Sequence, residues 1–351
     1  MAVKSSGALS FSTDIVGEFG GTAPHSLSEY KRNGDLVPDA AANSDIPTTN
    51  SNIQFSDYYG STAATAFSSP TGTNLKQINA YTYLTGTLGW DGSSPVTWTI
   101  PSDVWIWSDS TSVAALTIPS SMNGKLTIIN NGKIIGRGGN GGYRSNSSST
   151  SVGGAGGPAI QNDATGVTLT NNSGAYIAGG GGGGGSANHD GYSGGGGGGA
   201  GGGRGGGTYN NNGSTAGGAI GAEGTDGSGG SYGTDGNQVA AQGGGAGGGG
   251  AAYDYDGSDR TNGTGGAGGR ILPGTGGAKG TAGGGVSGGA GGSAGNAGAN
   301  GGGAGGGGGW GAAGGRAGFN GYASGGAGGA AIAGTAIATY TNNGTVYGST
   351  A

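Results

Sequence analysis

The chain has 351 residues, of which 99 are glycine and none is cysteine, and its formal net charge is −5. The lack of cysteine excludes disulfide bonds and thiolate metal sites, and nine prolines without glycine at every third position exclude a collagen helix. The acidic balance argues against nucleic acid as a partner, and no run of 18 apolar residues predicts a membrane span. The two histidines, His25 and His189, belong to no recognisable nucleophile arrangement, so we predict neither an enzyme nor a bound cofactor.

Glycine is distributed unevenly along the chain. Residues 1–135 hold 12 of the 99 glycines, which leaves 87 for residues 136–351. We therefore predict a small N-terminal docking module over residues 1–60, a β-rich connector over 61–135 and a glycine-rich domain over 136–351. The expected fold class is mostly β and irregular structure.

The predicted N-terminal module mixes short elements. Apolar and polar residues alternate over Ala8–Ser12, which predicts a short strand. Ser26 and Glu29 have the spacing of a capping box, which predicts a short helix through Tyr30 and Lys31.

The same module contains a weak internal echo. Gly7–Ser12 resembles Ser51–Ser56, and an aspartate follows each copy, at Asp14 and Asp57. Two compatible interpretations remain for this module: a small structural unit with capped turns, or a docking module that attaches the chain to a larger assembly.

The predicted connector has β-branched and aromatic residues at the density of strands. The expected strands are Ala80–Leu88, Val96–Ile100, Val104–Trp107 and Leu126–Ile129. Four of the five tryptophans lie in this region, at Trp90, Trp98, Trp105 and Trp107. A packed sheet core is favoured for them over a sugar-binding cluster.

An internal repeat occurs at both edges of the glycine-rich region. Its three copies, Leu126–Gly136, Val167–Gly179 and Ala338–Gly348, each read as strand, Asn-Asn turn with glycine, strand. Because Asn and Gly tolerate positive φ, each copy is predicted to be a β-hairpin. Hairpins that bracket the glycine runs indicate ordered structure rather than a flexible linker.

Ordered glycine runs are expected to form a bundle of polyglycine-II helices, with three residues per turn and a rise of ~3.1 Å per residue. These helices have no internal hydrogen bonds, so their N–H and C=O groups must pair between neighbours, and only glycine permits close approach on all sides. In Gly-Gly-X segments, X is expected to face outward. Ordering a glycine costs about 1–2 kcal/mol, so the bundle requires nearly complete backbone pairing.

Three segments occur in an order that resembles a known family: residues 136–142 (GRGGNGG), 153–163 (GGAGGPAIQND) and 177–182 (IAGGGG). The succession is similar to the glycine-rich domain of the receptor-recognising adhesins on the long tail fibres of T-even-type phages. The resemblance implies a polyglycine-II bundle whose loops bind a bacterial outer-surface receptor, protein or polysaccharide. It also implies a place in the virion, in the distal tail or tail fibre.

The resemblance weakens toward the N-terminus. Residues 1–123 do not look like the attachment region of that family, and two of their segments resemble short modules of marine-phage structural proteins. We still expect residues 1–123 to contact other tail or fibre proteins.

Segments between the glycine runs have the Tyr, Ser, Asn and Gly composition of recognition loops. The receptor-contact candidates are Tyr143, Arg144, His189, Tyr192, Tyr209, Tyr232, Tyr253, Tyr255, Arg260, Trp310, Phe319 and Tyr322. For Trp310, two roles are open: capping the bundle or anchoring a receptor. A Ca²⁺ site at Asp254, Asp256 and Asp259 is disfavoured against a plain acidic loop, because the distal bidentate Glu of an EF-hand is missing.

Other functions were weighed against the adhesin. They are a virion decoration or tail protein without a receptor role, an ice-binding polyglycine-II protein, a glycine-rich wall or matrix protein, and a depolymerising enzyme. Interrupted runs and tyrosine-rich segments disfavour ice binding, distinct terminal regions disfavour a matrix protein, and no catalytic carboxylate pair is identifiable.

Overall fold

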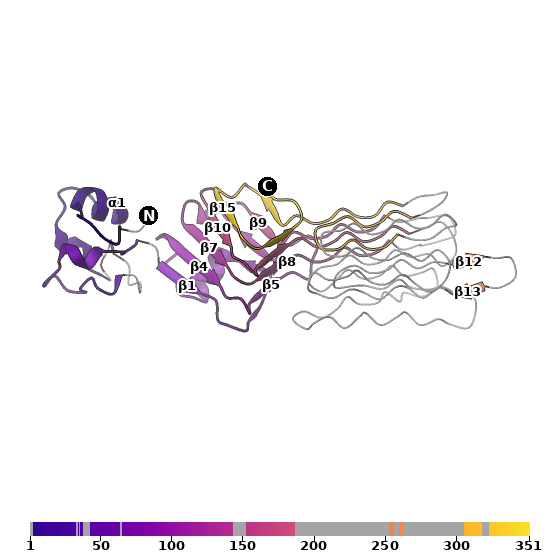
Figure 1. The fold of residues 1–351 in the computed structure, drawn as a ribbon, viewed down its shortest axis with the longest axis horizontal. Coiled ribbons are helices and arrows are strands. Elements are labelled where there is room, and N and C mark those ends of the chain that lie inside the picture. Colours follow the sequence, from indigo (N-terminus) through magenta and orange to yellow (C-terminus); the bar gives the residue numbers. More distant parts are fainter. Residues whose placement is uncertain are drawn as a thin grey trace.

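The computed structural model describes residues 3–32, 34, 36–37, 43–63, 65–142, 152–186, 305–317 and 323–351, and the backbone of 253–255 and 260–262. The chain is mostly β with few helices, as predicted. Its described parts follow one another along the long axis (Figure 1): an N-terminal unit of residues 3–63, a β-structured body, and glycine runs that extend from the body away from the N-terminal unit.

The N-terminal unit is built from short helices around a small core. The helices are η1 (Phe11–Ile15), α1 (Val16–Phe19), η2 (Leu27–Tyr30) and η4 (Phe55–Tyr58). The buried side chains are Val3, Ile15, Phe19, Tyr30, Val37, Ile46 and Tyr58. The helix predicted after Ser26 is confirmed as η2, although the Ser26 side chain makes no capping hydrogen bond.

The strand predicted over Ala8–Ser12 is wrong, because η1 begins at Phe11. Ser10 has extended backbone and caps η1 by accepting a hydrogen bond from the Thr13 N–H. Its own N–H donates to the Asp14 carboxylate at 2.6 Å. This hydrogen bond, followed by the contact with Lys4, holds the pKa of Asp14 below its usual value. Local side-chain capping therefore outweighs the alternating pattern.

The body is a three-sided parallel β-helix, in which successive strands pass through three sheets in turn. The first sheet contains β1 (Thr65–Ser68), β4 (Val96–Ile100), β7 (Leu126–Asn130), β10 (Thr168–Asn171) and β15 (Thr339–Asn342). The second contains β2 (Asn74–Lys76), β5 (Trp105–Trp107), β8 (Lys133–Ile135), β11 (Tyr176–Ala178) and β16 (Thr345–Tyr347). The third contains β3 (Ile78–Asn79), β6 (Leu116–Ile118), β9 (Ile160–Asn162) and β14 (Ile332–Gly334).

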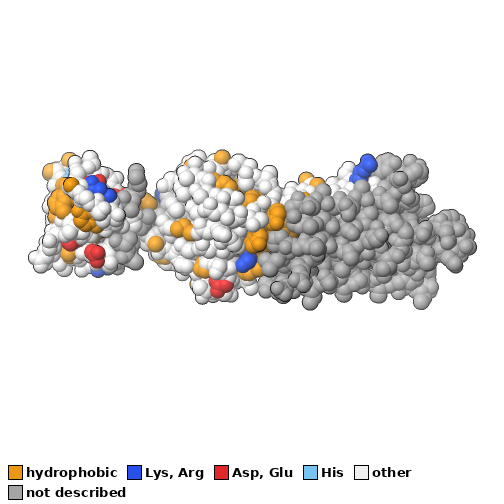
Figure 2. Space-filling model, viewed as in Figure 1, with side chains coloured by type: hydrophobic (Ala, Val, Ile, Leu, Met, Phe, Trp, Pro, Cys, Tyr) orange, Lys and Arg blue, Asp and Glu red, His pale blue; other side chains and the backbone are white. Residues whose placement is uncertain are grey.

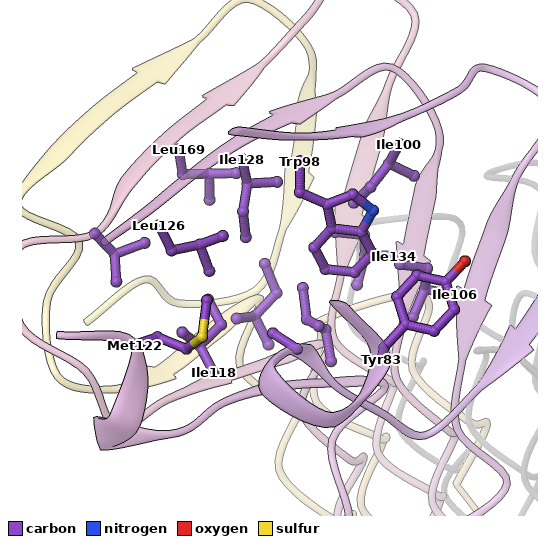
Figure 3. Close-up of a cluster of buried hydrophobic side chains, with 14 of the residues drawn as sticks. Tyr83, Trp98, Ile100, Ile106, Ile118, Met122, Leu126, Ile128, Ile134 and Leu169 are labelled. Carbon is purple, nitrogen blue, oxygen red and sulfur yellow. The ribbon is translucent and has the colours of Figure 1, made fainter. Parts of the chain in front are cut away.

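The core of the β-helix is a stack of side chains that point inward from all three sheets. In the first sheet, Trp98, Ile128 and Leu169 are aligned in register and fully buried. Ile106 and Ile134 are aligned in the same way in the second sheet. Figure 3 shows these side chains converging, with Met122 of η5 (Ser120–Met122) among them. The strands predicted at Val96–Ile100, Val104–Trp107 and Leu126–Ile129 are confirmed as β4, β5 and β7.

The strand predicted over Ala80–Leu88 is wrong, because α2 (Ala80–Gly86) occupies this segment. The Asn79 side chain accepts a hydrogen bond from the Thr82 N–H and so caps the helix. Ala80, Tyr83 and Leu84 are buried, which is the i, i+3, i+4 spacing of one helical face. The helical spacing of the buried residues therefore outweighs the aromatic content that predicted a strand.

The prediction that each Asn-Asn turn forms a β-hairpin is also wrong. The strands on the two sides of each turn, such as β7 and β8, lie in different sheets and pair in parallel with the equivalent strands of the next repeat. Each repeat copy is therefore a corner of the β-helix. A hairpin and a β-helix corner use the same turn residues, so the sequence of one repeat copy does not distinguish the two structures.

An asparagine ladder runs along this corner. Asn130, Asn171 and Asn342 end β7, β10 and β15 in register. The Asn130 amide donates to the Asn171 side-chain oxygen at 2.8 Å, and the Asn171 amide donates to the Asn342 oxygen at 2.8 Å. Asn130 and Asn171 are fully buried, so the ladder satisfies polar groups that would otherwise be costly.

We predict that Asn171→Ala destabilises the β-helix strongly. The substitution leaves the buried Asn130 amide without this acceptor, at a cost of about 1–3 kcal/mol per unsatisfied group. Equilibrium unfolding in urea measures the loss. The outward-facing Thr170→Ala in the same strand is the control and should cost clearly less; equal losses would contradict a structural role for the ladder.

Candidate functional site

The described glycine runs leave and rejoin the β-helix at its corner between the second and third sheets. One excursion departs after β8 and returns before β9, and the other departs after β11 and returns before β14. We call the described part of these runs the glycine lattice; it comprises residues 136–142, 152–158, 179–186, 305–317 and 323–331. The ordered β-helix therefore fixes one end of every excursion.

Backbone hydrogen bonds join the runs of the glycine lattice at intervals of three residues. Gly136, Gly139 and Gly142 donate to Ala178, Gly181 and Gly184 at 2.8 Å, in parallel. Gly305, Gly308 and Gly311 donate to Gly185, Gly182 and Gly179 at 2.7–3.0 Å, in the opposite direction. These hydrogen bonds join separate runs, and the run 305–317 also pairs with itself across its turn, where Gly315 donates to Gly306. Each run therefore depends on its neighbours.

The run 179–185 lies at the centre of this network. It donates to carbonyls of residues 154–157 and 312–315, and its own carbonyls accept from residues 139–142, 305–311 and 326–329. Every residue from 179 to 186 is buried. The central run is therefore enclosed by backbone on several sides.

A Cβ on the central run would collide with neighbouring carbonyl oxygens in three directions. A Cβ on Gly180 or Gly183 would overlap with the carbonyl oxygen of Arg137 or Asn140, respectively. A Cβ on Gly181 or Gly184 would overlap with that of Gly308 or Gly305. A Cβ on Gly182 or Gly185 would overlap with that of Gly326 or Ala323. Only glycine fits at these positions.

Larger residues occupy every third position on the outside of the lattice. Ser324 and Ala327 are exposed, whereas Ala323, Gly326 and Gly329 are buried. Ala313 and Arg316, again three residues apart, are exposed on a neighbouring run. The prediction that X of Gly-Gly-X faces outward is confirmed for these residues.

The far ends of the runs are held together. Gly142 bonds to Gly184, and Gly185 bonds to both Gly315 and Gly305. Ala317 and Gly153 also bond to Ala323 and Ser324, respectively. Residues 142, 152, 186, 305, 317 and 323 therefore mark one end of the lattice, which we call the loop end. Segments 143–151, 187–304 and 318–322 all begin and finish there.

Trp310 lies at the opposite end of the lattice. It is fully buried and clusters with Ile135 of β8 and Ala178 of β11, and its ring meets Tyr347 of β16 edge-on at a centroid distance of 6.4 Å. The turn that follows uses Gly311 at φ +65°. This position fits the capping role of Trp310 rather than a receptor contact. Capping is one of the two roles that the sequence leaves open for Trp310, and its glycine neighbours do not distinguish them.

For the other receptor-contact candidates, the structure describes no side chains, so it does not show whether they lie together. Tyr143, Arg144, His189, Tyr192, Tyr209, Tyr232, Phe319, Tyr322, Asp256 and Asp259 lie outside the described residues. Tyr253–Tyr255 and Arg260–Asn262 form the antiparallel strands β12 and β13, in which Tyr255 is paired with Arg260 and Asp254 with Thr261. Figure 1 draws this pair beyond the loop end.

No described helix has the length and apolarity to cross a membrane. Within the same residues, no group of three His, Cys, Asp or Glu side chains is arranged to hold a metal ion.

We predict that Gly183→Ala disrupts the lattice although it adds a single methyl group. The Cβ would overlap with the Asn140 carbonyl oxygen, and forcing atoms into a packed interior costs about 1–3 kcal/mol. Thermal unfolding measures the effect. Ala327→Ser, at an exposed outer position, is the control and should shift stability by no more than about 0.5 kcal/mol. Equal melting temperatures for the two variants would contradict the close packing.

Trp310→Ala is expected to lower stability by about 3–5 kcal/mol, the usual cost of emptying a buried aromatic site. Urea unfolding of the full chain is the measurement. A stability-neutral Trp310→Ala that nevertheless abolished binding to cells would instead support the receptor-anchor role.

The fold and the lattice together define an elongated β-structured protein in which glycine runs extend from a parallel β-helix. The family model of the phage tail fibre adhesin Gp38 matches residues 65–246, more than half of the chain. The chain therefore belongs to the phage tail fibre adhesin Gp38 family, which confirms the predicted place in the tail fibre of the virion.

Two further comparisons were made. Among solved structures, the chain is similar to the crystal structure of the gp37–gp38 adhesin tip complex of the bacteriophage S16 long tail fiber, with 19% sequence identity and a TM-score of 0.39. That match covers 87% of this chain and 89% of the other. The curated proteins contain no match.

Proposed function

We propose that the chain is a non-enzymatic adhesin that binds a bacterial cell-surface receptor through the segments carried by the loop end. The observation that carries this proposal is the convergence of residues 142, 152, 186, 305, 317 and 323 on one end of the lattice. Three segments anchored on a common rigid base can present a shared surface, as recognition loops do on other scaffolds. Membership of an adhesin family supports the same role.

The scaffold in this proposal is a polyglycine-II bundle. Three observations support it: hydrogen bonds that recur every three residues, burial that repeats with the same period, and neighbouring carbonyls on three sides of the central run. A threefold extended helix without internal hydrogen bonds has this period. Such a base lends rigidity to the segments at its end, so binding loses less conformational freedom.

The N-terminal part supplies attachment to other tail or fibre proteins in this proposal. Residues 3–63 lie at the end of the described molecule opposite the loop end (Figure 1). The family match begins at residue 65, immediately after this unit. A tail-fibre adhesin with its receptor surface at one end needs its virion contact elsewhere, and the N-terminal unit is placed for that contact.

Binding of the purified, labelled chain to a panel of bacterial cells and their extracted surface components tests the receptor role. We expect saturable binding to one strain, competed by the matching phage. Replacing residues 251–264 with a glycine-serine segment of equal length should abolish that binding and leave the melting temperature of the chain unchanged.

The control is Phe55→Ser on the N-terminal unit, which should bind cells as the unaltered chain does. Absence of binding to every strain, with the chain still present in virions, would overturn the receptor role in favour of a decoration or tail protein. A thermal-hysteresis assay on the same sample excludes or establishes the ice-binding alternative.

A further inference from the structure

The echo between Gly7–Ser12 and Ser51–Ser56 corresponds to a duplicated structural motif. In each copy an extended residue, Ser10 or Gln54, precedes a short helix. The N–H of that residue donates to the aspartate that follows, at 2.6 Å for Asp14 and 2.7 Å for Asp57. The next residue, Phe11 or Phe55, is then the first residue of its helix in both copies.

The two copies meet at their phenylalanines. The Phe11 and Phe55 rings contact each other edge-to-face, with centroids 6.0 Å apart. Tyr59, which follows η4 in the second copy, donates a hydrogen bond from its hydroxyl to the Gly7 carbonyl of the first copy. The duplication therefore produces one continuous surface, which we call the aromatic face and define as Phe11, Phe55 and Tyr59.

The aromatic face remains accessible in the described chain. Phe55 is 44% exposed and Tyr59 37% exposed, and they are two of the four large hydrophobic side chains classed as exposed among the described residues. Phe55 and Tyr59 do not belong to the core of the unit, in which Ile15, Tyr30 and Tyr58 are fully buried, whereas Phe11 packs against that core. Figure 2 shows hydrophobic side chains gathered on the visible side of the N-terminal unit, with charged groups beside them. Clustered exposed aromatics are typical of protein interfaces.

The net charge of the N-terminal unit restricts the partner of the aromatic face. Residues 1–63 contain seven Asp or Glu and three Lys or Arg, a net charge of −4 out of −5 for the whole chain. An apolar surface on an acidic unit is complementary to an apolar pocket with a basic rim. Nucleic acid and acidic lipid surfaces are disfavoured by the same charge.

We propose that the aromatic face is the contact by which this chain docks onto another protein of the same tail fibre, through an apolar pocket flanked by Lys or Arg side chains. This inference rests on the proposed attachment role and names the residues and partner chemistry for it. Phe55, the most exposed of the three, inserts into the pocket, and Phe11 supports it from the side.

Reconstitution of virions that lack this chain tests the docking surface. Purified full-length variants are mixed with such virions, and the bound chain is quantified after the particles are re-isolated. We expect Phe55→Ser to reduce incorporation at least about tenfold, whereas Phe55→Leu, which keeps the side chain apolar, stays within about threefold of the unaltered chain.

The matched control is Val113→Ser, which removes an equally exposed hydrophobic side chain (44%) from the β-helix and should not change incorporation. Incorporation should also fall as ionic strength rises, since screening weakens attraction between exposed charges. Full incorporation of Phe55→Ser, or an equal loss with Val113→Ser, would overturn the docking surface. Cell binding by the purified Phe55→Ser chain reads out the receptor role independently, so failure of one proposal is distinguishable from failure of the other.

Discussion

Close approach of bare backbone is the constraint on which the glycine lattice depends. The positions that a Cβ would take on the run 179–185 are occupied by carbonyl oxygens of neighbouring runs. The runs stand so close because their backbones are joined by hydrogen bonds in a pattern that repeats every three residues. Apolar side chains therefore have no place around the run 179–185. Its cohesion comes from backbone pairing, which needs almost every N–H and C=O to find a partner.

The β-helix sets the register of the glycine runs, because the runs have no side chains that could define it. Parallel coils stack in register, and the ladder through Asn130, Asn171 and Asn342 links three of them at one corner. At the next corner of the β-helix both excursions begin, one after β8 and the other after β11, and these two strands are adjacent. Trp310 then closes the junction by packing between these strands and the first turn of a returning run. Side-chain chemistry at the junction thus sets the starting positions of runs that otherwise consist of backbone alone.

Sequence patterns gave much of the local structure and little of the long-range pairing. Strands β4, β5 and β7 followed from β-branched and aromatic residues, and outward X residues followed from the three-residue period. The repeat is visible in the sequence, but the strands that pair lie far apart in the chain. Asn130 and Asn171 are 41 residues apart, and Asn171 and Asn342 are 171 residues apart. A turn motif determines the local φ and ψ and not the sheet to which the next strand belongs, so the same turn sequence is compatible with a hairpin and with a β-helix corner. The burial of Trp310 likewise depends on a surface formed by residues about 130 to 175 positions earlier.

The three-residue period has a consequence for how such a chain can change over time. Deleting or adding one residue in a run would turn everything beyond it by one third of a turn, so that an outward residue such as Ala327 would face the carbonyls of its neighbours. Insertions and deletions within a run are compatible with the lattice only in steps of three.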